Sequence, residues 1–124
     1  GDYVGNSFYV DLTANDYYSK AMAEFPDRKF LVFSDDIEWC KKQDIFKDCE
    51  FYNQGFWGWT NENDVGDLNA MASCEHNIIA NSSFSWWAAW LNPNPNKIVV
   101  APKQWFADLE NEKFIGLPNT WIRI

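Results

Sequence analysis

The chain has 124 residues, 47% of them hydrophobic and 19% aromatic, and a net charge of −8. This length fits a single domain, and the high apolar content excludes a disordered chain. The acidic balance argues against nucleic-acid or anionic-membrane partners, because a negative chain repels phosphate-bearing surfaces.

Helices and strands are predicted in alternation from residue 17 onward. Helical spacing of apolar residues runs over 17–25, where Pro26 ends it, and a second helix is expected after Asp35 or Asp36. Two further helices are predicted at 65–74 and 84–91, the last apolar on nearly every side and therefore buried. Four short apolar runs between and after these helices predict strands, at 30–33, 49–52, 77–80 and 98–101.

This alternation predicts an α/β fold, a Rossmann-like parallel sheet with helices on both faces. Ligands in such sheets bind at the carboxyl edge of the strands. Residues 53–64 are predicted as a loop, and 102–124 as an irregular tail that packs back on the sheet. A parallel sheet that begins with a helix is unusual, so residues 1–4 are interpreted as the exit of a first strand that is missing from this sequence.

The turn Asn81-Ser82-Ser83 lies between a predicted strand and a predicted helix. Free backbone N–H groups, the helix dipole and the serine hydroxyls make such a turn a natural anion site. The alternative is an ordinary serine N-cap, although one cap requires fewer polar side chains than this turn holds. No GxGxxG or P-loop motif is present, and the turn's formal glycosylation sequon is interpreted as a chance match.

Three aspartates follow or begin other predicted elements near the same edge. Asp35 and Asp36 come directly after the first predicted strand. Two roles are open for them: capping of the next helix, or recognition of a ribose or base. A metal site there would require further oxygen ligands. Asp67 lies in the first turn of the predicted 65–74 helix. Its carboxylate either interacts favourably with the helix dipole or accepts two N–H bonds from a guanine edge. The single histidine, His76, is predicted to be structural.

A second class of function is suggested by the aromatic loop that contains Trp57 and Trp59. Exposed tryptophans stack on sugar rings, so a carbohydrate-binding module without transferase activity remains an alternative. The three cysteines form no CxxC pair, which favours reduced thiols and a cytoplasmic protein. No apolar run reaches the roughly 18 residues of a membrane span.

Five blocks of sequence together resemble glycosyltransferase family 11, the galactoside α-1,2-fucosyltransferases, particularly the bacterial and viral members. The blocks are GDYV at 1–4, YYSKAM at 17–22, FSDDIEWCK at 33–41, NIIANSSFSWWAAWLN at 77–92 and KIVVAPKQWF at 97–106. They run through nearly the whole chain in the order of the family. Members of this family are two-domain GT-B enzymes of carbohydrate biosynthesis. They transfer fucose from GDP-fucose with inversion, without a metal or other cofactor.

The resemblance implies that this chain is most of the C-terminal, donor-binding domain. Ser82, Ser83, Phe84 and Ser85 would line the diphosphate, Asp67 would lie near the guanine, and Asp35 and Asp36 near the nucleoside. Asp2 would end the family's HxRRGD motif and is the candidate catalytic residue. The acceptor would be a galactoside, bound largely by an N-terminal domain that this sequence does not contain.

One departure from the family pattern limits this implication. The sequence begins at the Gly of HxRRGD, so it lacks the two arginines that would neutralise the departing diphosphate. Loss of one such charge-stabilising donor costs about 3–4 kcal/mol in a transition state. We therefore expect the 124-residue polypeptide to bind donor but to have little or no transferase activity.

Overall fold

The computed structural model describes residues 9–52 and 61–124, and it contains alternating helices and strands. In chain order the elements are α1 (Tyr17–Ala23), β1 (Leu31–Val32), α2 (Ile37–Lys41), the 3-10 helix η1 (Asp44–Phe46), β2 (Glu50–Phe51), α3 (Asn61–Ala72), β3 (Asn77–Ile78), α4 (Ser83–Leu91), β4 (Val99–Ala101), the 3-10 helix η2 (Leu109–Phe114) and β5 (Ile122–Arg123). The predicted α/β alternation is confirmed.

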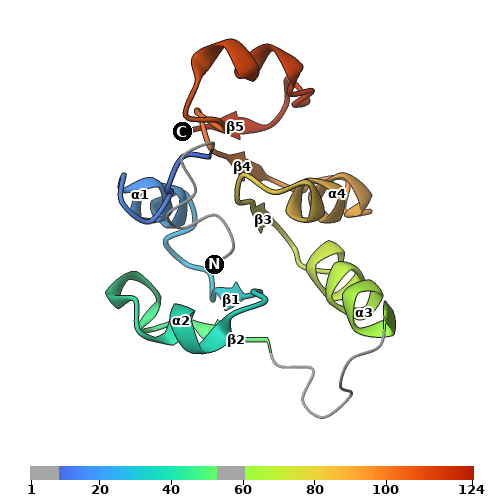
Figure 1. Cartoon of the computed structure of the whole chain (residues 1–124). Coiled ribbons are helices and arrows are strands. Elements are labelled where there is room, and N and C mark those ends of the chain that lie inside the picture. The colour runs from blue at the N-terminus through green and yellow to red at the C-terminus, as the bar shows by residue number, and fades with distance from the viewer. Residues whose placement is uncertain (1–8, 53–60) are drawn as a thin grey trace.

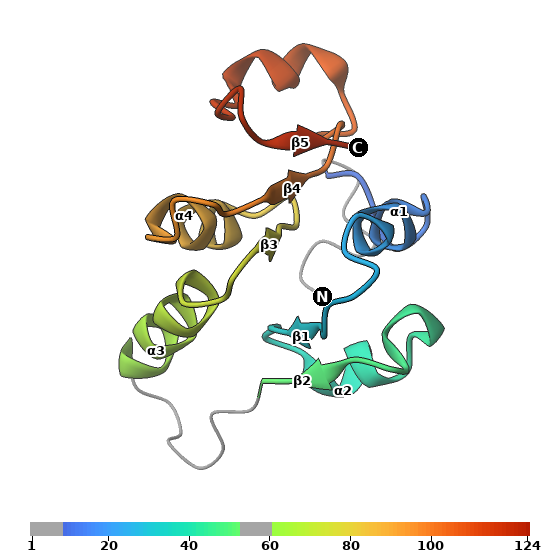
Figure 2. The same cartoon turned by 180° about the vertical axis from the view of Figure 1, so that it is seen from behind.

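The described strands form two parallel sheets. One has the order β1-β2 and the other β3-β4-β5, and every pairing is parallel. Figure 1 shows the strands stacked as β5, β4, β3, β1 and β2, with β3 and β1 as neighbours across the break between the sheets; Figure 2 shows the same order from behind. Helices α1 and α4 lie on opposite sides of this stack (Figure 1).

Two clusters of buried side chains hold the elements together. One centres on Ile79, Val99 and Ala101 and includes two tryptophans of the C-terminal segment, Trp105 and Trp121. The other joins α1 to the sheet through Tyr17, Ala21 and Val100, among others. Both of these tryptophans are 7% exposed and belong to the same cluster as the β4 residues Val99 and Ala101.

The C-terminal segment is more regular than predicted. Residues 102–124 include η2 and a fifth strand, β5, which pairs with β4. The sequence did not indicate this strand, because Ile122-Arg123 is short and both of its side chains are exposed. A strand without a continuous apolar run carries no clear pattern.

Three helix predictions need correction. Helix α3 begins at Asn61, so the predicted loop at 53–64 is wrong for residues 61–64, while 53–60 lie outside the described residues. Asp67 is therefore in the second turn of the helix, away from the N-terminal dipole charge. Helix α4 begins at Ser83 and is buried on one face only: its small residues Ala88 and Ala89 face inward, while Trp87 and Trp90 are half exposed.

Helices on both faces of a sheet would bury its strands completely, and the structure shows this only in part. All three residues of β4 are buried, but Leu31 in β1 is 41% exposed. No helix in the described part of the chain is long and apolar enough to cross a membrane.

Candidate functional site

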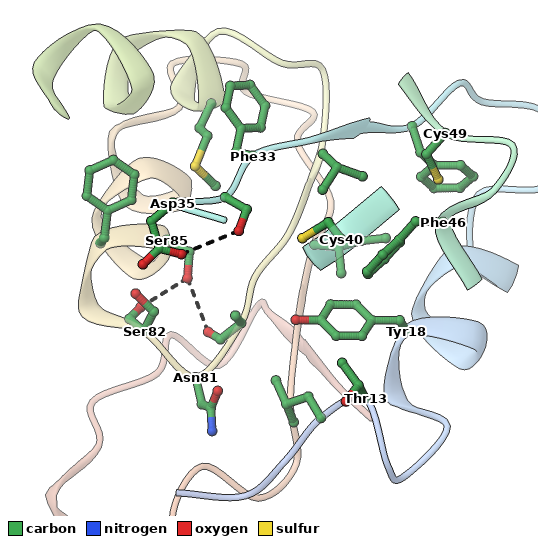
Figure 3. A pocket seen from close by; sticks show the side chains of 18 of the residues that line it. Thr13, Tyr18, Phe33, Asp35, Cys40, Phe46, Cys49, Asn81, Ser82 and Ser85 are labelled. Atoms are coloured by element: carbon green, nitrogen blue, oxygen red, sulfur yellow. Dashed lines mark hydrogen bonds between the residues drawn. The ribbon is translucent and has the colours of Figure 1, made fainter. Parts of the chain in front are cut away.

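A cavity of about 590 Å³ opens between the two sheets and extends past the carboxyl ends of β1 and β3. We call it the central cavity. Its apolar part is lined by strand and helix side chains such as Leu31, Val32, Ile78 and Met71. Polar residues that follow the two strands line another part, and Figure 3 shows Asp35 and Ser82 on one side of the view and Tyr18 and Cys40 on the other.

Six of the eight residues predicted as site residues line this cavity. They come from three separate segments of the chain: Asp35, Asp67, Ser82, Ser83, Phe84 and Ser85. Asp36 is not among the lining residues, and Asp2 lies outside the residues that the structure describes. Trp57 and Trp59, on which the carbohydrate-module alternative rests, also lie outside them.

The serines of the α4 N-terminus differ in what their hydroxyls do. Ser82 is the N-cap residue, with extended backbone, but its side chain makes no capping hydrogen bond. The buried Ser85 hydroxyl contacts the carbonyl oxygens of Ala80 at 3.2 Å and Ser82 at 3.0 Å, as the dashed lines of Figure 3 show. Ser85 therefore supports the turn, whereas the half-buried Ser82 and the exposed Ser83 lie at the start of α4, beside the first-turn N–H groups.

Asn81, the first residue of the turn, is structural. It is 4% exposed, and its side-chain amide donates to the carbonyl oxygens of Val10 at 2.9 Å and Trp105 at 3.1 Å. These two bonds tie the turn to segments on both sides of it in sequence. Burial also makes the Asn81 sequon inaccessible in the folded chain, in agreement with its interpretation as a chance match.

The two aspartates after β1 differ in what their carboxylates contact. Asp36 caps α2, since its carboxylate accepts from the Trp39 N–H at 3.0 Å. Asp35 is exposed and lines the cavity, where the Ser34 hydroxyl lies 3.4 Å from its carboxylate. Ser34 also accepts from the Asp36 N–H at 3.0 Å, which fixes the turn that presents Asp35.

The electrostatic character of the described lining is acidic. Three carboxylates line the cavity, those of Asp11, Asp35 and Asp67, and no lysine, arginine or histidine is among the described lining residues. Among the described residues, His, Cys, Asp and Glu side chains form no group of three that could hold a metal ion. The groups of the described lining that can donate hydrogen bonds to an anion are the N–H groups and hydroxyls at the start of α4.

Sequence reasoning missed the contribution of the segment before α1. Asp11 and Thr13 line the cavity, and the Asp11 carboxylate accepts from both the N–H and the hydroxyl of Thr13. Tyr18 was placed on the apolar stripe of a helix, yet it also lines the cavity, and burial raises the pKa of its phenol. No pattern signals these positions, because only the fold brings the segment beside β3.

His76 has a structural role, as predicted. Its Nδ1 accepts from the Ile98 N–H at 2.9 Å, and its ring stacks on Phe25 with 5.2 Å between centroids. All three cysteines have free thiols, and Cys40 and Cys49 line the cavity.

Comparison with known proteins places this arrangement in a family. The profile described as "Glycosyl transferase family 11" matches residues 1–124. The chain belongs to glycosyltransferase family 11. It is 36% identical to the "O-antigen biosynthesis glycosyltransferase WbnK" of Escherichia coli over 135 aligned positions, which cover 100% of this chain and 42% of that protein.

A second family 11 relative is similar at a comparable level. The chain is 40% identical to the "Alpha-1,2-colitosyltransferase" of Escherichia coli, again over 100% of its own length and 44% of the relative's. The chain thus spans less than half the length of the curated relatives it matches. No solved structure matches it.

Proposed function

We propose that this chain is the donor-binding part of an inverting α-1,2-fucosyltransferase, with its central cavity as the seat of the GDP group of GDP-fucose. The observation that carries the proposal is the convergence of Asp35, Asp67 and Ser82 on one cavity at the carboxyl ends of β1 and β3. That edge is where open parallel sheets bind nucleotides. Membership of a glycosyltransferase family supports a nucleotide-sugar ligand.

Each part of the ligand has a chemically matched group in the cavity. The diphosphate would lie at the N-terminus of α4, where Ser82 and Ser83 supply hydroxyls and the first helical turn supplies N–H groups. The guanine edge would donate two N–H bonds to the Asp67 carboxylate, a fixed acceptor pair that a uracil ring could not satisfy in the same way. Asp35 would accept from a ribose hydroxyl.

The reaction in the whole protein would be a displacement at the anomeric carbon. An acceptor galactoside hydroxyl would attack that carbon, lose its proton to a general base, and expel GDP with inversion. Asp2 is the candidate base, and an acceptor domain would lie in a part of the protein outside these 124 residues. Because the described lining holds carboxylates and no cation, we propose that the chain alone binds the donor without turning it over.

Calorimetric titration with GDP-fucose, GDP and UDP tests the donor assignment. We expect GDP and GDP-fucose to bind at least tenfold more tightly than UDP, and Asp67→Asn to remove that preference, since a charged hydrogen-bonding pair contributes about 1.5–3 kcal/mol. Ser82→Ala should weaken GDP while leaving guanosine unchanged. Asp27→Asn and Ser19→Ala, both at exposed positions outside the cavity, serve as matched controls.

The same titration is repeated with a longer polypeptide that includes the sequence upstream of Gly1. Equal affinity for GDP and UDP in both polypeptides would rule out the guanine assignment. The name of one relative gives colitose as its transferred sugar, so comparing GDP with GDP-fucose separates recognition of the nucleotide from recognition of fucose. Turnover of the longer polypeptide in the presence of EDTA tests the proposed metal independence.

A further inference from the structure

The polar rim of the central cavity includes groups from two neighbouring helices. We use this name for the part of the cavity that Asp35, Asp67 and Ser82 line. Ser82 is the N-cap of α4, whereas Asp67 lies within α3, one helical turn before Met71. The two helices pack against each other, and they lie side by side in both views (Figures 1 and 2). The separation between the Asp67 carboxylate and the start of α4 therefore depends on how α3 is rotated against α4.

Apolar packing determines that rotation only weakly. Of the α3 side chains that the structure describes, those of Met71 and Ala72 are buried, and both lie at the C-terminal end of the helix. Hydrophobic contact has no preferred direction, so two buried side chains at one end do little to fix the rotation. Asp67 and Met71 are four residues apart and line the same cavity, so they share one face of α3. On the dimensions of an α-helix, a rotation of about 20° moves the tip of a side chain by about 2 Å.

Two buried asparagines supply the directional contacts at this end of α3. Asn77, the first residue of β3, is 6% exposed, and Asn92, the C-cap of α4, is 4% exposed. The side-chain amide of Asn77 donates to the carbonyl oxygen of Met71 at 2.8 Å. The side-chain amide of Asn92 donates to the Asn77 Oδ1 and to the carbonyl oxygen of Cys74, both at 2.8 Å. These bonds connect the C-terminus of α4, through the start of β3, to the last turn of α3.

The contacts of the two asparagines allow one orientation of each side-chain amide. Asn92 Oδ1 accepts from the Asn94 N–H at 3.0 Å, so both ends of the Asn92 amide have partners, as do both ends of the Asn77 amide. A flipped amide would place an oxygen against the carbonyl oxygen of Met71 or Cys74. A buried polar network with every group paired favours one arrangement over its alternatives. The network therefore fixes the last turn of α3 relative to α4.

We propose that Asn77 and Asn92 are positioning residues for nucleotide recognition, because their hydrogen bonds set the rotation of α3 and thereby the place of the Asp67 carboxylate. Neither asparagine is among the described residues that line the cavity, so each acts through α3. The inference rests on the proposed function, in which Asp67 recognises the guanine and the start of α4 holds the diphosphate. It adds that the spacing between these two groups is set from the far end of both helices.

A purely structural role would have a different consequence for binding. Destabilisation lowers the fraction of folded protein, and this reduces the apparent affinity for every ligand by the same factor. A displaced Asp67 would instead weaken GDP more than UDP, because the diphosphate of both nucleotides is held at α4. The ratio of the GDP and UDP affinities therefore separates positioning from stability.

Calorimetric titration of the longer polypeptide with GDP and UDP measures this ratio. We expect Asn92→Ala to reduce the preference for GDP from at least tenfold to less than about threefold. Lys97→Met is the matched control, because the Lys97 ammonium group donates to the Asn92 carbonyl oxygen at 3.0 Å and contacts the same end of α4. It should lower stability and keep the ratio. Should Asn92→Ala not fold, Asn77→Ser, whose shorter side chain loses the bond to Met71, takes its place with the same expected loss.

A double-mutant cycle tests whether the asparagines act through Asp67. In an Asp67→Asn background, Asn92→Ala should leave the ratio unchanged, since the group that it displaces no longer discriminates. A further change of the ratio in that background would overturn the inference. Retention of the full preference in Asn92→Ala, or in Asn77→Ser where that variant replaces it, would also overturn it, as would an equal loss of GDP and UDP affinity. These results would leave the guanine assignment standing, whereas equal affinities in the unaltered polypeptide would overturn that assignment and the inference together.

Discussion

The hydroxyl of Tyr17 donates to the carbonyl oxygen of Ile79 at 2.5 Å, and this bond joins α1 to the strand segment that leads into the polar rim of the cavity. The same hydroxyl lies 3.2 Å from the carbonyl oxygen of Val100 in β4. Tyr17 is 2% exposed, so its ring and its hydroxyl are both inside the fold. One side chain thus fixes a helix against two adjacent strands.

Tyr17→Phe should destabilise the chain by about 1–3 kcal/mol, because it leaves buried carbonyl groups with fewer donors while keeping the ring. Urea denaturation followed by tryptophan fluorescence measures the change in free energy of unfolding. Tyr52→Phe is the matched control, since the half-buried Tyr52 contacts Phe33 through its ring. Equal effects of the two substitutions would show that the Tyr17 hydroxyl contributes nothing specific.

Stability should fall as the pH rises above about 10. Burial, and secondarily Tyr18, raises the pKa of Tyr17 above its ordinary value of 10.0, and burial does the same for Tyr18. Above pH 10 the tyrosines of the unfolded chain lose their protons while those of the folded chain keep them. Ionisation therefore stabilises the unfolded state relative to the folded state, and the free energy of unfolding falls. The slope approaches about 1.4 kcal/mol per pH unit for each tyrosine.

The pH profile of the free energy of unfolding between pH 8 and 11 checks this expectation, and Tyr17→Phe should reduce its slope. The half-buried thiols of Cys49 and Cys74, whose pKa values desolvation raises above 9.0, should begin the decline earlier. Spectroscopic titration of the chain in urea gives the reference for unperturbed tyrosines. A profile that is flat to pH 11 would contradict the buried phenols.

The sequence predicted elements well where side-chain pattern alone decides them. Continuous apolar runs predicted β3 and β4, and Asp35 or Asp36 was expected to cap a helix, as Asp36 does. It predicted the burial of α4 poorly, since composition does not say which face meets the sheet. The acidic lining near Asp11 depends on long-range placement, for which local sequence gives no signal.

The C-terminus of α4 illustrates another long-range effect that the sequence did not indicate. The Lys97 ammonium group donates to the carbonyl oxygens of Ala89 at 2.8 Å, Trp90 at 3.2 Å and Asn92 at 3.0 Å. A cation at this end satisfies terminal carbonyls and the negative end of the helix dipole. The predicted helix at 84–91 ends at the residue where α4 ends, Leu91, but the sequence did not indicate which residue stabilises that end.

Lys97→Met should therefore cost about 1–2 kcal/mol, because it keeps the aliphatic stem and removes the donors. Differential scanning calorimetry should show a loss of about 4 °C in Tm for each kcal/mol. Lys47→Met, at an exposed position, is the control and should leave Tm unchanged within about 1 °C. A Lys97→Met protein that melts like the control would contradict the capping role.

Asn81→Asp should destabilise the turn strongly, by about 3 kcal/mol. The substitution replaces an amide donor with a carboxylate facing the carbonyl oxygens of Val10 and Trp105. Chemical denaturation compares it with Asn119→Asp, at an exposed position. If Asn81→Asp were as mild as the control, the amide would not hold the turn as described.

The acidic lining leads to a prediction about salt and nucleotide binding. A phosphate held by lysine or arginine binds more weakly as salt rises, because screening removes the attraction. The described lining instead presents the carboxylates of Asp11, Asp35 and Asp67, with hydroxyls and N–H groups as the donors. Screening should then reduce the repulsion between these carboxylates and the phosphates of GDP. The affinity of the 124-residue chain for GDP should therefore hold or rise between 50 and 500 mM sodium chloride.

The longer polypeptide, which would add the two arginines of the family motif, should bind GDP more weakly as the salt concentration rises. Calorimetry at four salt concentrations distinguishes the two slopes, and a tenfold loss of affinity with salt in the 124-residue chain would mean that a cationic side chain contacts the diphosphate there.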